Sequence, residues 1–399
     1  MLASVFVIST QAAITAEDYE ALGMPVLYVD TEYRKKIKSK ESYLDAEFRL
    51  VEDGAVLQSG GAKIRGRGNS TWKTIDTAKK PYLLKLDTAE PLLGMARARK
   101  WVLFANATDK TFLRNECAFH IARTVFTGTG YVPQERYVTL VVNGRYEGLY
   151  CLCEKIEAAP DKIFLPDDES FLAEANMHGG EQWDFASPLG VRFSIKEKEG
   201  APDDYYESAR ARLIEAERVL YSAQLSDEES GWQKYLDAQS FVDWYLINEF
   251  ARNYDACFRA SCYLYYSTRT QKLHMGPIWD FDIAFGNDKS HESYKPEGYT
   301  VNTQSWYFLL WQDPRFRELA AARWNERRGQ LEAAYGWLCN RAQELQAAAD
   351  LNDRVWRAFG HRQWPNAPGY RKRKTYQAEV AYMLSYMRAR AQWLDSEFN

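Results

Sequence analysis

The hydrophobic pattern of this chain changes its period along the sequence, and this change limits the folds that the chain can adopt. Between residues 25 and 157, short runs of β-branched and aromatic residues are separated by Gly, Asp and Asn, which is typical of strands. Near the C-terminal end, Val380, Met383, Met387 and Leu394 recur with the 3.6-residue period of a helix. We therefore expect an α+β protein with a β-rich N-terminal part and a mainly helical C-terminal part.

The β-rich part contains a series of candidate strands that is interrupted by a candidate helix. The helix is expected at residues 111–124, where Leu113, Cys117 and Ile121 share one stripe. Asn143-Gly144 favours a two-residue hairpin turn, so it should join the last two strands. The expected strands are 26–29, 44–50, 62–65, 82–86, 101–104, 137–142 and 148–153.

These patterns divide the chain into an N-terminal extension (1–23), a β-rich domain (24–157) and a helical domain (158–399). The helical domain carries two signals for helix starts. Ser240 followed by Asp243 resembles a capping box for an apolar helix, and Asp313-Pro314 offers a cap and a first-turn proline for another. We expect both helices to begin at these positions.

Composition narrows the function classes. The 51 basic and 55 acidic residues give a net charge of −4, without the basic excess that phosphate-backbone binding draws on, so nucleic acid is a poor default partner. No apolar run reaches the ~18 residues of a membrane span, and no H-E-x-x-H motif supports a zinc enzyme. Residues 1–13 resemble either a truncated export signal or a frayed N-terminus, because the apolar patch lacks a preceding positive region.

The segment Ile64–Trp72 reads IRGRGNSTW and has the densest local chemistry in the β-rich part. Two glycines at alternate positions let backbone amides approach an anion, and the neighbouring arginines can neutralise phosphate charge. A tight hairpin with a solvated basic tip explains the same residues. Lys85 then ends an expected strand, where it could reach the phosphates of a nucleotide or be an ordinary surface lysine.

Acidic residues flank an expected hairpin in the helical part. Asp255 follows a helix, and Asp280 and Asp282 come 25 and 27 residues later, beyond two short strand-like segments. Carboxylates at the two ends of a hairpin can converge on Mg²⁺ and on a substrate hydroxyl. Asp280 and Asp282 would share a face if their segment were extended. Turn capping is the alternative role for these residues.

Five strings make the chain similar to a known family. RGRGNSTW, KKPYLLKL, RKWVLFANATDKTFLRN, NGRYEGLYCLCEKIE and GPIWDFDIAFGN resemble the motif series of the CotH family, the spore-coat-type atypical protein kinases. The resemblance runs from about Met24 almost to the end of the chain. It implies a two-lobed atypical kinase fold that uses ATP and Mg²⁺ to phosphorylate Ser or Thr on partner proteins.

The resemblance also implies roles for single residues. Lys85 would pair with the nucleotide phosphates, Asp255 would be the catalytic-loop carboxylate, and Asp280 would hold the metal as the Asp of a kinase D-F-G motif does. One position departs from the kinase pattern: Ala260 stands five residues after Asp255, where a second metal-binding Asn is usual. The residues that would cover the phosphates are Arg65, Gly66, Arg67, Gly68, Asn69 and Ser70.

Three further residues receive supporting roles from the resemblance. Asp282 and Asn287 would assist the metal, and Glu154 would lie near the hinge between the lobes, beside the nucleotide. Two other functions stay open at this point: a non-catalytic kinase-fold binding module and an enzyme that transfers AMP. The resemblance implies a spore coat or a cell surface as the location, a cytoplasmic location stays open, and we expect a monomer.

Overall fold

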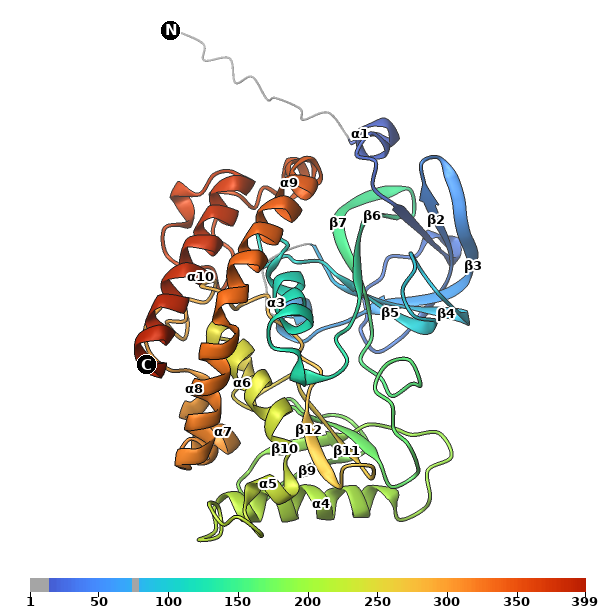
Figure 1. Ribbon diagram of the computed structural model, residues 1–399. Coiled ribbons are helices and arrows are strands. Elements are labelled where there is room, and N and C mark those ends of the chain that lie inside the picture. The colour runs from blue at the N-terminus through green and yellow to red at the C-terminus, as the bar shows by residue number, and fades with distance from the viewer. Residues whose placement is uncertain (1–13, 74–78) are drawn as a thin grey trace, which may run out of the picture.

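The computed structural model describes residues 14–73 and 79–399 and has the expected α+β composition. Strands dominate the N-terminal part and helices the C-terminal part (Figure 1). The segment that resembles an export signal, residues 1–13, lies outside the described residues. Among the described residues, no helix combines the length and the apolar composition needed to cross a membrane.

The β-rich part is a closed barrel, which is more specific than the prediction. All the expected strands are present, most of them longer than predicted. The first strand pairs antiparallel with the second and parallel with the sixth, which closes the barrel. The strands are β1 (Val26–Thr31), β2 (Leu44–Glu52), β3 (Ala55–Gly66), β4 (Tyr82–Glu90), β5 (Ala98–Phe104), β6 (Glu135–Val142) and β7 (Arg145–Glu154), in the spatial order β1-β2-β3-β4-β5-β7-β6.

Alternation of side chains along the strands fills the barrel. Leu27, Ile64, Leu84, Trp101 and Leu140 point inward and are fully buried. The residues between them face outward, as the two-residue period requires. The interior of the barrel is therefore an apolar core of its own.

The predicted hairpin turn is confirmed. Asn143 and Gly144 join β6 to β7 with φ angles of 53° and 74°. Positive φ at both central residues is the requirement of a type I′ turn, which explains the Asn-Gly pair. The helix expected between the strands is α3 (Arg114–Thr124), which begins three residues later than predicted.

A second sheet has five strands, three of which come before α4 (Tyr205–Leu220) in the chain and two of which come between α6 (Ala238–Ala251) and α7 (Ser305–Leu310). Its spatial order is β12-β11-β8-β10-β9, so β8 pairs with β11, which lies about 90 residues later in the chain. Both hydrogen-bonded neighbours of β11 are antiparallel to it. The strands are β8 (Phe171–Ala175), β9 (Asp184–Ala186), β10 (Arg192–Ile195), β11 (Cys262–Ser267) and β12 (Lys272–Met275).

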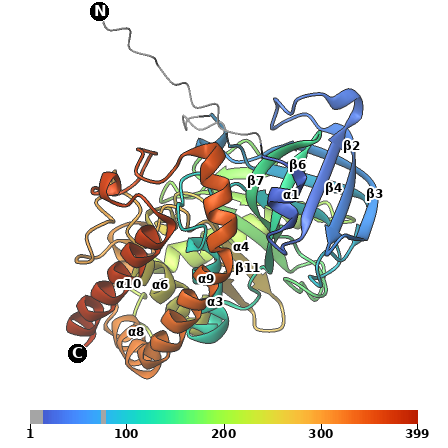
Figure 2. The ribbon, with the colours of Figure 1, turned by 90° about the horizontal axis from the view of Figure 1, so that it is seen from above.

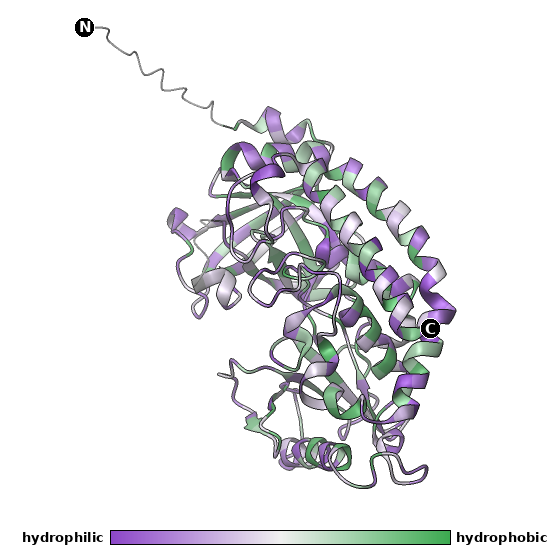
Figure 3. Cartoon of the chain, turned by 90° about the vertical axis from the view of Figure 1, so that its left-hand side faces the viewer, coloured by the Kyte–Doolittle hydropathy of each residue, from purple (hydrophilic) through white to green (hydrophobic). Residues whose placement is uncertain are grey.

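Helices of the C-terminal part pack on one side of the barrel (Figures 1 and 2), and α4 lies below the second sheet in the view of Figure 1. The central helix, α6, is buried on all sides. The outer helices contain both hydrophobic and hydrophilic residues along their length (Figure 3). The helices are α1 (Ala16–Glu20), α2 (Ser70–Lys73), α4 (Tyr205–Leu220), α5 (Trp232–Tyr235), α6 (Ala238–Ala251), α7 (Ser305–Leu310), α8 (Pro314–Arg327), α9 (Leu331–Trp356) and α10 (Tyr376–Phe398).

One of the two predicted helix starts is correct. Asp313 caps α8 through a bond from the amide of Arg315, with Pro314 in the first turn. The capping box at Ser240 is wrong, because Asp237 is the cap of α6 and accepts from the amide of Ser240. Asp243 instead lies inside the helix and forms an ion pair with Arg323.

A continuous apolar core joins the barrel to the helices. It runs from the outward-facing residues Leu83 and Val102 through Phe119 of α3 to Met387 of α10. Trp279 lies within it, against Phe104 of the barrel and Phe119. This shared core holds the segment that follows β12 against the outer face of the barrel.

Candidate functional site

The hairpin β11–β12 brings the predicted acidic residues together. Asp255 lies in a short 3-10 turn between α6 and β11, and Asp280 follows β12. The carboxyl groups are close enough that the negative charge of Asp280 raises the pKa of Asp255 and of Asp282. We call Asp255, Asp280 and Asp282 the acidic cluster.

Burial and mutual repulsion shift the titration of the acidic cluster. Burial, with the neighbouring charge of Asp280, raises the pKa of Asp255 to about 7. The same two causes raise the pKa of Asp282 to about 8, against the hydrogen bond from Thr108. Groups with perturbed pKa values concentrate at functional sites. The acidic cluster is therefore able to take up a cation or a proton near neutral pH.

The backbone at Asp280 differs from the prediction. Its φ is 66°, in the left-handed region, so the segment is not extended there and the argument that Asp280 and Asp282 share a strand face is wrong. The side-chain amide of Asn253 holds the turn by donating to the backbone carbonyl of Asp280 at 3.2 Å. Ser261 donates to the Asp280 carboxylate at 3.4 Å. The two carboxylates interact through this turn instead.

The segment Phe281–Phe285 is supported from the other side by residues from the loop after β5 and from the start of α3. Thr108 donates to the Asp282 carboxylate at 2.7 Å, and the side-chain oxygen of Asn115 accepts from the amide of Phe281 at 2.7 Å. Arg114 donates to the carbonyl of Ala284 at 2.9 Å. These contacts join the barrel to the acidic cluster and fix the position of its backbone.

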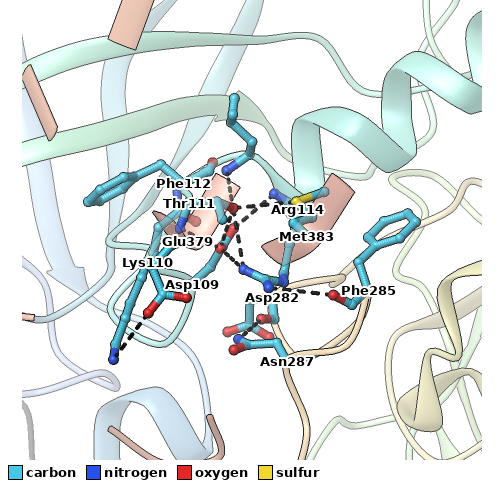
Figure 4. A network of polar contacts seen from close by, with 12 residues as sticks. Asp109, Lys110, Thr111, Phe112, Arg114, Asp282, Phe285, Asn287, Glu379 and Met383 are labelled. Atoms are coloured by element: carbon cyan, nitrogen blue, oxygen red, sulfur yellow. Dashed lines mark hydrogen bonds and ion pairs between the residues drawn. The ribbon is translucent and has the colours of Figure 1, made fainter. Parts of the chain in front are cut away.

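Arg114 is itself held by a buried ion pair. Its guanidinium lies 2.5 Å from the carboxylate of Asp109, and neither side chain is more than 1% exposed (Figure 4). Asp109 also accepts from the amide of Arg114 at 2.8 Å and from the hydroxyl of Thr111 at 2.6 Å. A carboxylate with this many donors is a structural brace rather than a reactive group.

We call Ile64–Trp72 the Gly-Arg segment. Arg67 is the residue of this segment that approaches the acidic cluster. Its positive charge acts on Asp280, although burial keeps the pKa of that carboxyl above its usual value. The guanidinium lies 5.1 Å from the ring centre of Phe104. Arg65 instead lies over the ring of Tyr43, at 4.9 Å. The structure thus brings Arg67, and not the whole segment, to the acidic cluster.

The remaining residues of this segment have local contacts. A Cβ atom at Gly66 would lie 2.3 Å from the ring of Trp72, so the close approach of that ring requires glycine. Gly68 has a φ of 87°. Lys40 bonds the carbonyl of Gly68 and the side chain of Asn69, at 3.2 and 2.9 Å. Ser70 begins the short helix α2.

Lys85 lies in the middle of β4, not at its end as predicted. It is paired across the sheet with Lys63 on β3 and Lys100 on β5. Burial and the charge of Lys100 lower the pKa of Lys155, which directly follows β7, so these two lysines lie close together. Directly opposite residues share one face. Lys63, Lys85, Lys100 and Lys155 therefore form a lysine row on the outer face of the barrel, the face from which Arg65 also projects.

Two predicted site residues are engaged within the protein. Glu154 is 0% exposed, and its carboxylate accepts from the amides of Ala96 and Gln134, at 3.0 and 2.8 Å, and from the hydroxyl of Tyr131. Asn287 donates to the carbonyls of Thr108 and Asp282, at 3.0 and 2.7 Å. Their side chains brace the C-terminal end of β7 and the acidic segment.

A metal would have to be held by the oxygen donors of the acidic cluster. Within residues 14–73 and 79–399, no group of three or more His, Cys, Asp or Glu side chains has the geometry of a metal site. Mg²⁺ at nucleotide sites is typically held by one or two carboxylates together with phosphate oxygens. Asp280 and Asp282 match that donor set.

Sequence reasoning assigned no role to Thr108, Asn115, Arg114 or Ser261. Thr108 and Asn115 lie 174 and 166 residues before their partners in the acidic segment, so no local pattern connects them. The available signal was the string of short polar residues in ANATDKT, between a strand and a helix. Such a string marks a loop whose side chains bond backbone groups.

Comparison with known families gives one result. A family model described as CotH kinase protein matches residues 64–394 of the chain. The match begins in β3 at Ile64, the first residue of the Gly-Arg segment, and ends inside α10, so it includes every residue of the acidic cluster. A search of curated proteins finds no matching sequence.

Proposed function

The chain belongs to the CotH family, and from this premise we propose that it is an atypical protein kinase with a two-lobed kinase-like arrangement. It would transfer the γ-phosphate of ATP to Ser or Thr of a partner protein, with Mg²⁺ as the metal. The family name supports a kinase-like protein, and the residue roles below are our own assignments. The family also suggests association with a spore coat.

The observation that carries the proposal is the acidic cluster facing Arg67. Burial raises the pKa of all three carboxyl groups, and the neighbouring charge of Asp280 adds to the rise at Asp255 and Asp282. Crowded carboxylates cost folding free energy unless a cation or proton neutralises them. Their retention beside an arginine from the Gly-Arg segment is what a phosphoryl-transfer site requires, since a metal and a phosphate bring opposite charges to the same place.

Asp255 is the group that we assign to the acceptor hydroxyl. Its pKa of about 7 suits a general base that works near neutral pH. In the reaction, the acceptor oxygen bonds to the γ-phosphorus, the bond from that phosphorus to the bridging oxygen breaks, and ADP leaves. The hydroxyl proton goes to the Asp255 carboxylate. Arg259, which lowers the pKa of Asp255, limits the shift and keeps part of the population ionised.

Asp280 and Asp282 would hold Mg²⁺. When bound, the ion would offset the negative charge of the phosphates. The chain contributes the fixed orientation of the two carboxylates. The bond from Thr108 orients Asp282, and the bond from Ser261 orients Asp280. Asn287 supports the same loop through its bond to the carbonyl of Asp282.

The lysine row and Arg67 would bind the phosphates. Lys63, Lys85 and Lys100 lie opposite one another on neighbouring strands and give this face of the barrel positive charge. Lys63 is already paired with Asp45 at 2.5 Å, whereas Lys85 lies deeper in the row, 5.9 Å from the ring of Tyr43. We therefore keep Lys85 as the principal phosphate-binding lysine.

A cavity beside Asp255 has room for an acceptor peptide. It has a volume of about 340 Å³ and is lined by Cys257, Phe258 and Arg259, which follow Asp255 in the chain. Met177 and Leu189 form its other wall and are exposed, at 51% and 43%. A peptide in this cavity would extend away from its acceptor hydroxyl at Asp255.

The test is label transfer from ATP. With Mg²⁺ and the protein alone or with a Ser/Thr-containing peptide, label from γ-labelled ATP should enter protein and label from α-labelled ATP should not. Asp255→Asn should abolish transfer while nucleotide binding persists, and Asp203→Asn, at an exposed position outside the proposed site, should change neither. Transfer of the α-label would favour AMP transfer. Binding without any transfer would favour a non-catalytic module.

A further inference from the structure

A second cavity lies away from the acidic cluster, in the loops that connect α9 to α10. Its volume is about 490 Å³. Trp364, which is 42% exposed, and Tyr370 provide aromatic surface, and Pro365 and Pro368 add apolar wall. We call it the α9–α10 pocket. A cavity of this size with exposed aromatic surface is able to hold a short segment of another molecule.

The rim of the α9–α10 pocket is positively charged. Lys289, Arg362, Arg371 and Lys372 line it, all of them exposed, and no lining residue is acidic. The neighbouring carboxylate of Asp288 is buried and accepts from the amide of Ser290 and from the ring of His291. The pocket therefore offers several cations to an anionic ligand without a competing carboxylate on its wall.

The pocket also contains hydrogen-bond acceptors that lack donors. The side-chain oxygens of Gln363 and Asn366 are buried, and neither has a hydrogen-bond partner in the described part of the chain. Asn366 is only 7% exposed. A buried acceptor without a donor is costly, and a ligand that supplies N–H groups would remove that cost.

We propose that the α9–α10 pocket binds an anionic segment of a partner protein. An acidic or phosphorylated side chain of an extended peptide would meet the basic rim, and an apolar side chain would pack on Trp364. The backbone N–H groups of the peptide would meet the side-chain oxygens of Asn366 and Gln363 once these buried side chains turn toward the pocket. Carboxylate and phosphate share this chemistry, and the test below separates them. The inference concerns binding and does not depend on the proposed kinase activity.

The floor of the pocket is connected to the acidic cluster. Asn366 donates to the carbonyl of Thr108 at 2.8 Å and to the side-chain oxygen of Asn287 at 2.9 Å. Thr108 in turn donates to the carboxylate of Asp282. A ligand that bonds Asn366 is therefore connected to Asp282 through one residue, Thr108. Occupancy of the pocket should alter the environment of the acidic cluster as well as recruit a partner.

The experiment titrates three fluorescein-labelled nonapeptides with the 399-residue protein, and fluorescence anisotropy measures their binding. They share a Gly/Ala background without unmodified Ser, Thr or Tyr and carry the central sequence Phe-Glu-Glu, Phe-phosphoserine-Glu or Phe-Lys-Lys. Saturable binding of the first two and none of the third is expected. A higher affinity for the second peptide would identify phosphate as the preferred anion, and equal or lower affinity would identify carboxylate.

Charge-matched double variants locate the site. Arg371→Glu/Lys372→Glu should weaken binding of the anionic peptides by about tenfold or more. Lys36→Glu/Lys38→Glu changes the net charge equally at exposed positions on the barrel side and should leave binding unchanged. Trp364→Ala should also weaken binding, because it removes the aromatic wall. Normal far-UV circular dichroism and melting temperature would show that these exposed changes leave the fold intact.

Two results would overturn the proposal. One is the absence of saturable binding of either anionic peptide to the unaltered protein. The other is equal loss in the two double variants, which would show a general charge effect. If the kinase assignment fails but the anionic peptides bind and Arg371→Glu/Lys372→Glu abolishes that binding, the pocket stands by itself as an interaction site.

Discussion

The protein contains two groups of buried carboxylates, which differ in what neutralises their charge. Asp109 and Glu249 are each paired with an arginine, Arg114 and Arg390, within 2.7 Å. Members of the acidic cluster instead raise one another's pKa. The first arrangement compensates each charge inside the protein, whereas the second leaves charge to be compensated by something that binds. This difference separates structural from functional carboxylates.

The largest expected effect is the loss of phosphoryl transfer from the acidic cluster. Asp280→Asn should lower the rate of label transfer from γ-labelled ATP by roughly 10³-fold, about 4 kcal/mol, because the metal and the phosphates lose a charged ligand. The free energy of unfolding in metal-free buffer should stay the same or rise, because repulsion is removed. Asp203→Asn, at an exposed position outside the proposed site, is the matched control. Wild-type transfer by folded Asp280→Asn would place this residue with the structural carboxylates.

The next largest effect concerns stability and the paired group. Arg390 is 0% exposed and bonds the backbone and the carboxylate of Glu249 together with the carbonyls of Pro296 and Gly298. Arg390→Met should cost about 3–5 kcal/mol of unfolding free energy, since it leaves a buried charge uncompensated. Arg388→Met, on a half-exposed side chain that lies 3.9 Å from Glu332, should cost less than about 1 kcal/mol.

Denaturant unfolding measures both variants, and the double variant Glu249→Gln/Arg390→Met sharpens the comparison. Removing the carboxylate charge along with its partner should recover part of the loss, which a double-mutant cycle quantifies. Equal, small losses for Arg390→Met and Arg388→Met would show that the pairing of Glu249 contributes little. The distinction between the two groups would then rest on catalysis alone.

Much of the barrel could be predicted because its information is local. Alternating apolar residues mark each strand, and Asn143-Gly144 marks a turn. Closure of the barrel through the parallel pairing of β1 with β6 was not predictable, since it joins segments more than 100 residues apart. The same holds for the pairing of β8 with β11. Local periodicity identifies strands but not their distant partners.

The candidate site also contains some residues whose proximity could be predicted from the sequence and others whose proximity could not. Asp255 and Asp280 flank one hairpin, so their proximity could be predicted from the chain order. The supporting residues could not, because Thr108 and Asn115 come from the loop after β5 and from α3. Ser240 shows the reverse error: a local pattern suggested a cap, but Asp237 occupies that position and Asp243 pairs with Arg323 in the folded protein.

The pH dependence of stability offers a smaller effect. Burial and charge crowding raise the pKa of Asp255 to about 7 and of Asp282 to about 8, above the unfolded value of 3.8. The folded state therefore binds more protons between about pH 4 and pH 8, and stability falls as pH rises through this window. Without metal, Asp282→Asn should become more stable relative to wild type by about 2 kcal/mol between pH 5 and pH 6.5.

Denaturant unfolding of wild type and Asp282→Asn in EDTA at both pH values measures this difference. The difference between the two proteins cancels the groups that titrate equally in both. Asn retains an oxygen that accepts from Thr108, so the hydrogen bond is preserved. A pH-independent difference would show that Asp282 titrates normally and that its charge is already compensated within the protein.

The smallest expected effect compares two cations in the lysine row. Lys63 is paired with Asp45 at 2.5 Å, and Lys85 is opposite it on β4. Lys85→Gln should weaken binding of Mg-ATP by about five- to tenfold, roughly 1 kcal/mol, because a phosphate loses a cation. Lys63→Gln should change the affinity by less than about twofold, since its charge is already offset and screened by solvent. Calorimetric titration at two salt concentrations measures both, and the effect of Lys85→Gln should diminish at the higher salt. Equal effects of the two variants would mean that the row acts as a diffuse positive field, in which case the paired and unpaired cations of the barrel do not follow the distinction seen among the carboxylates.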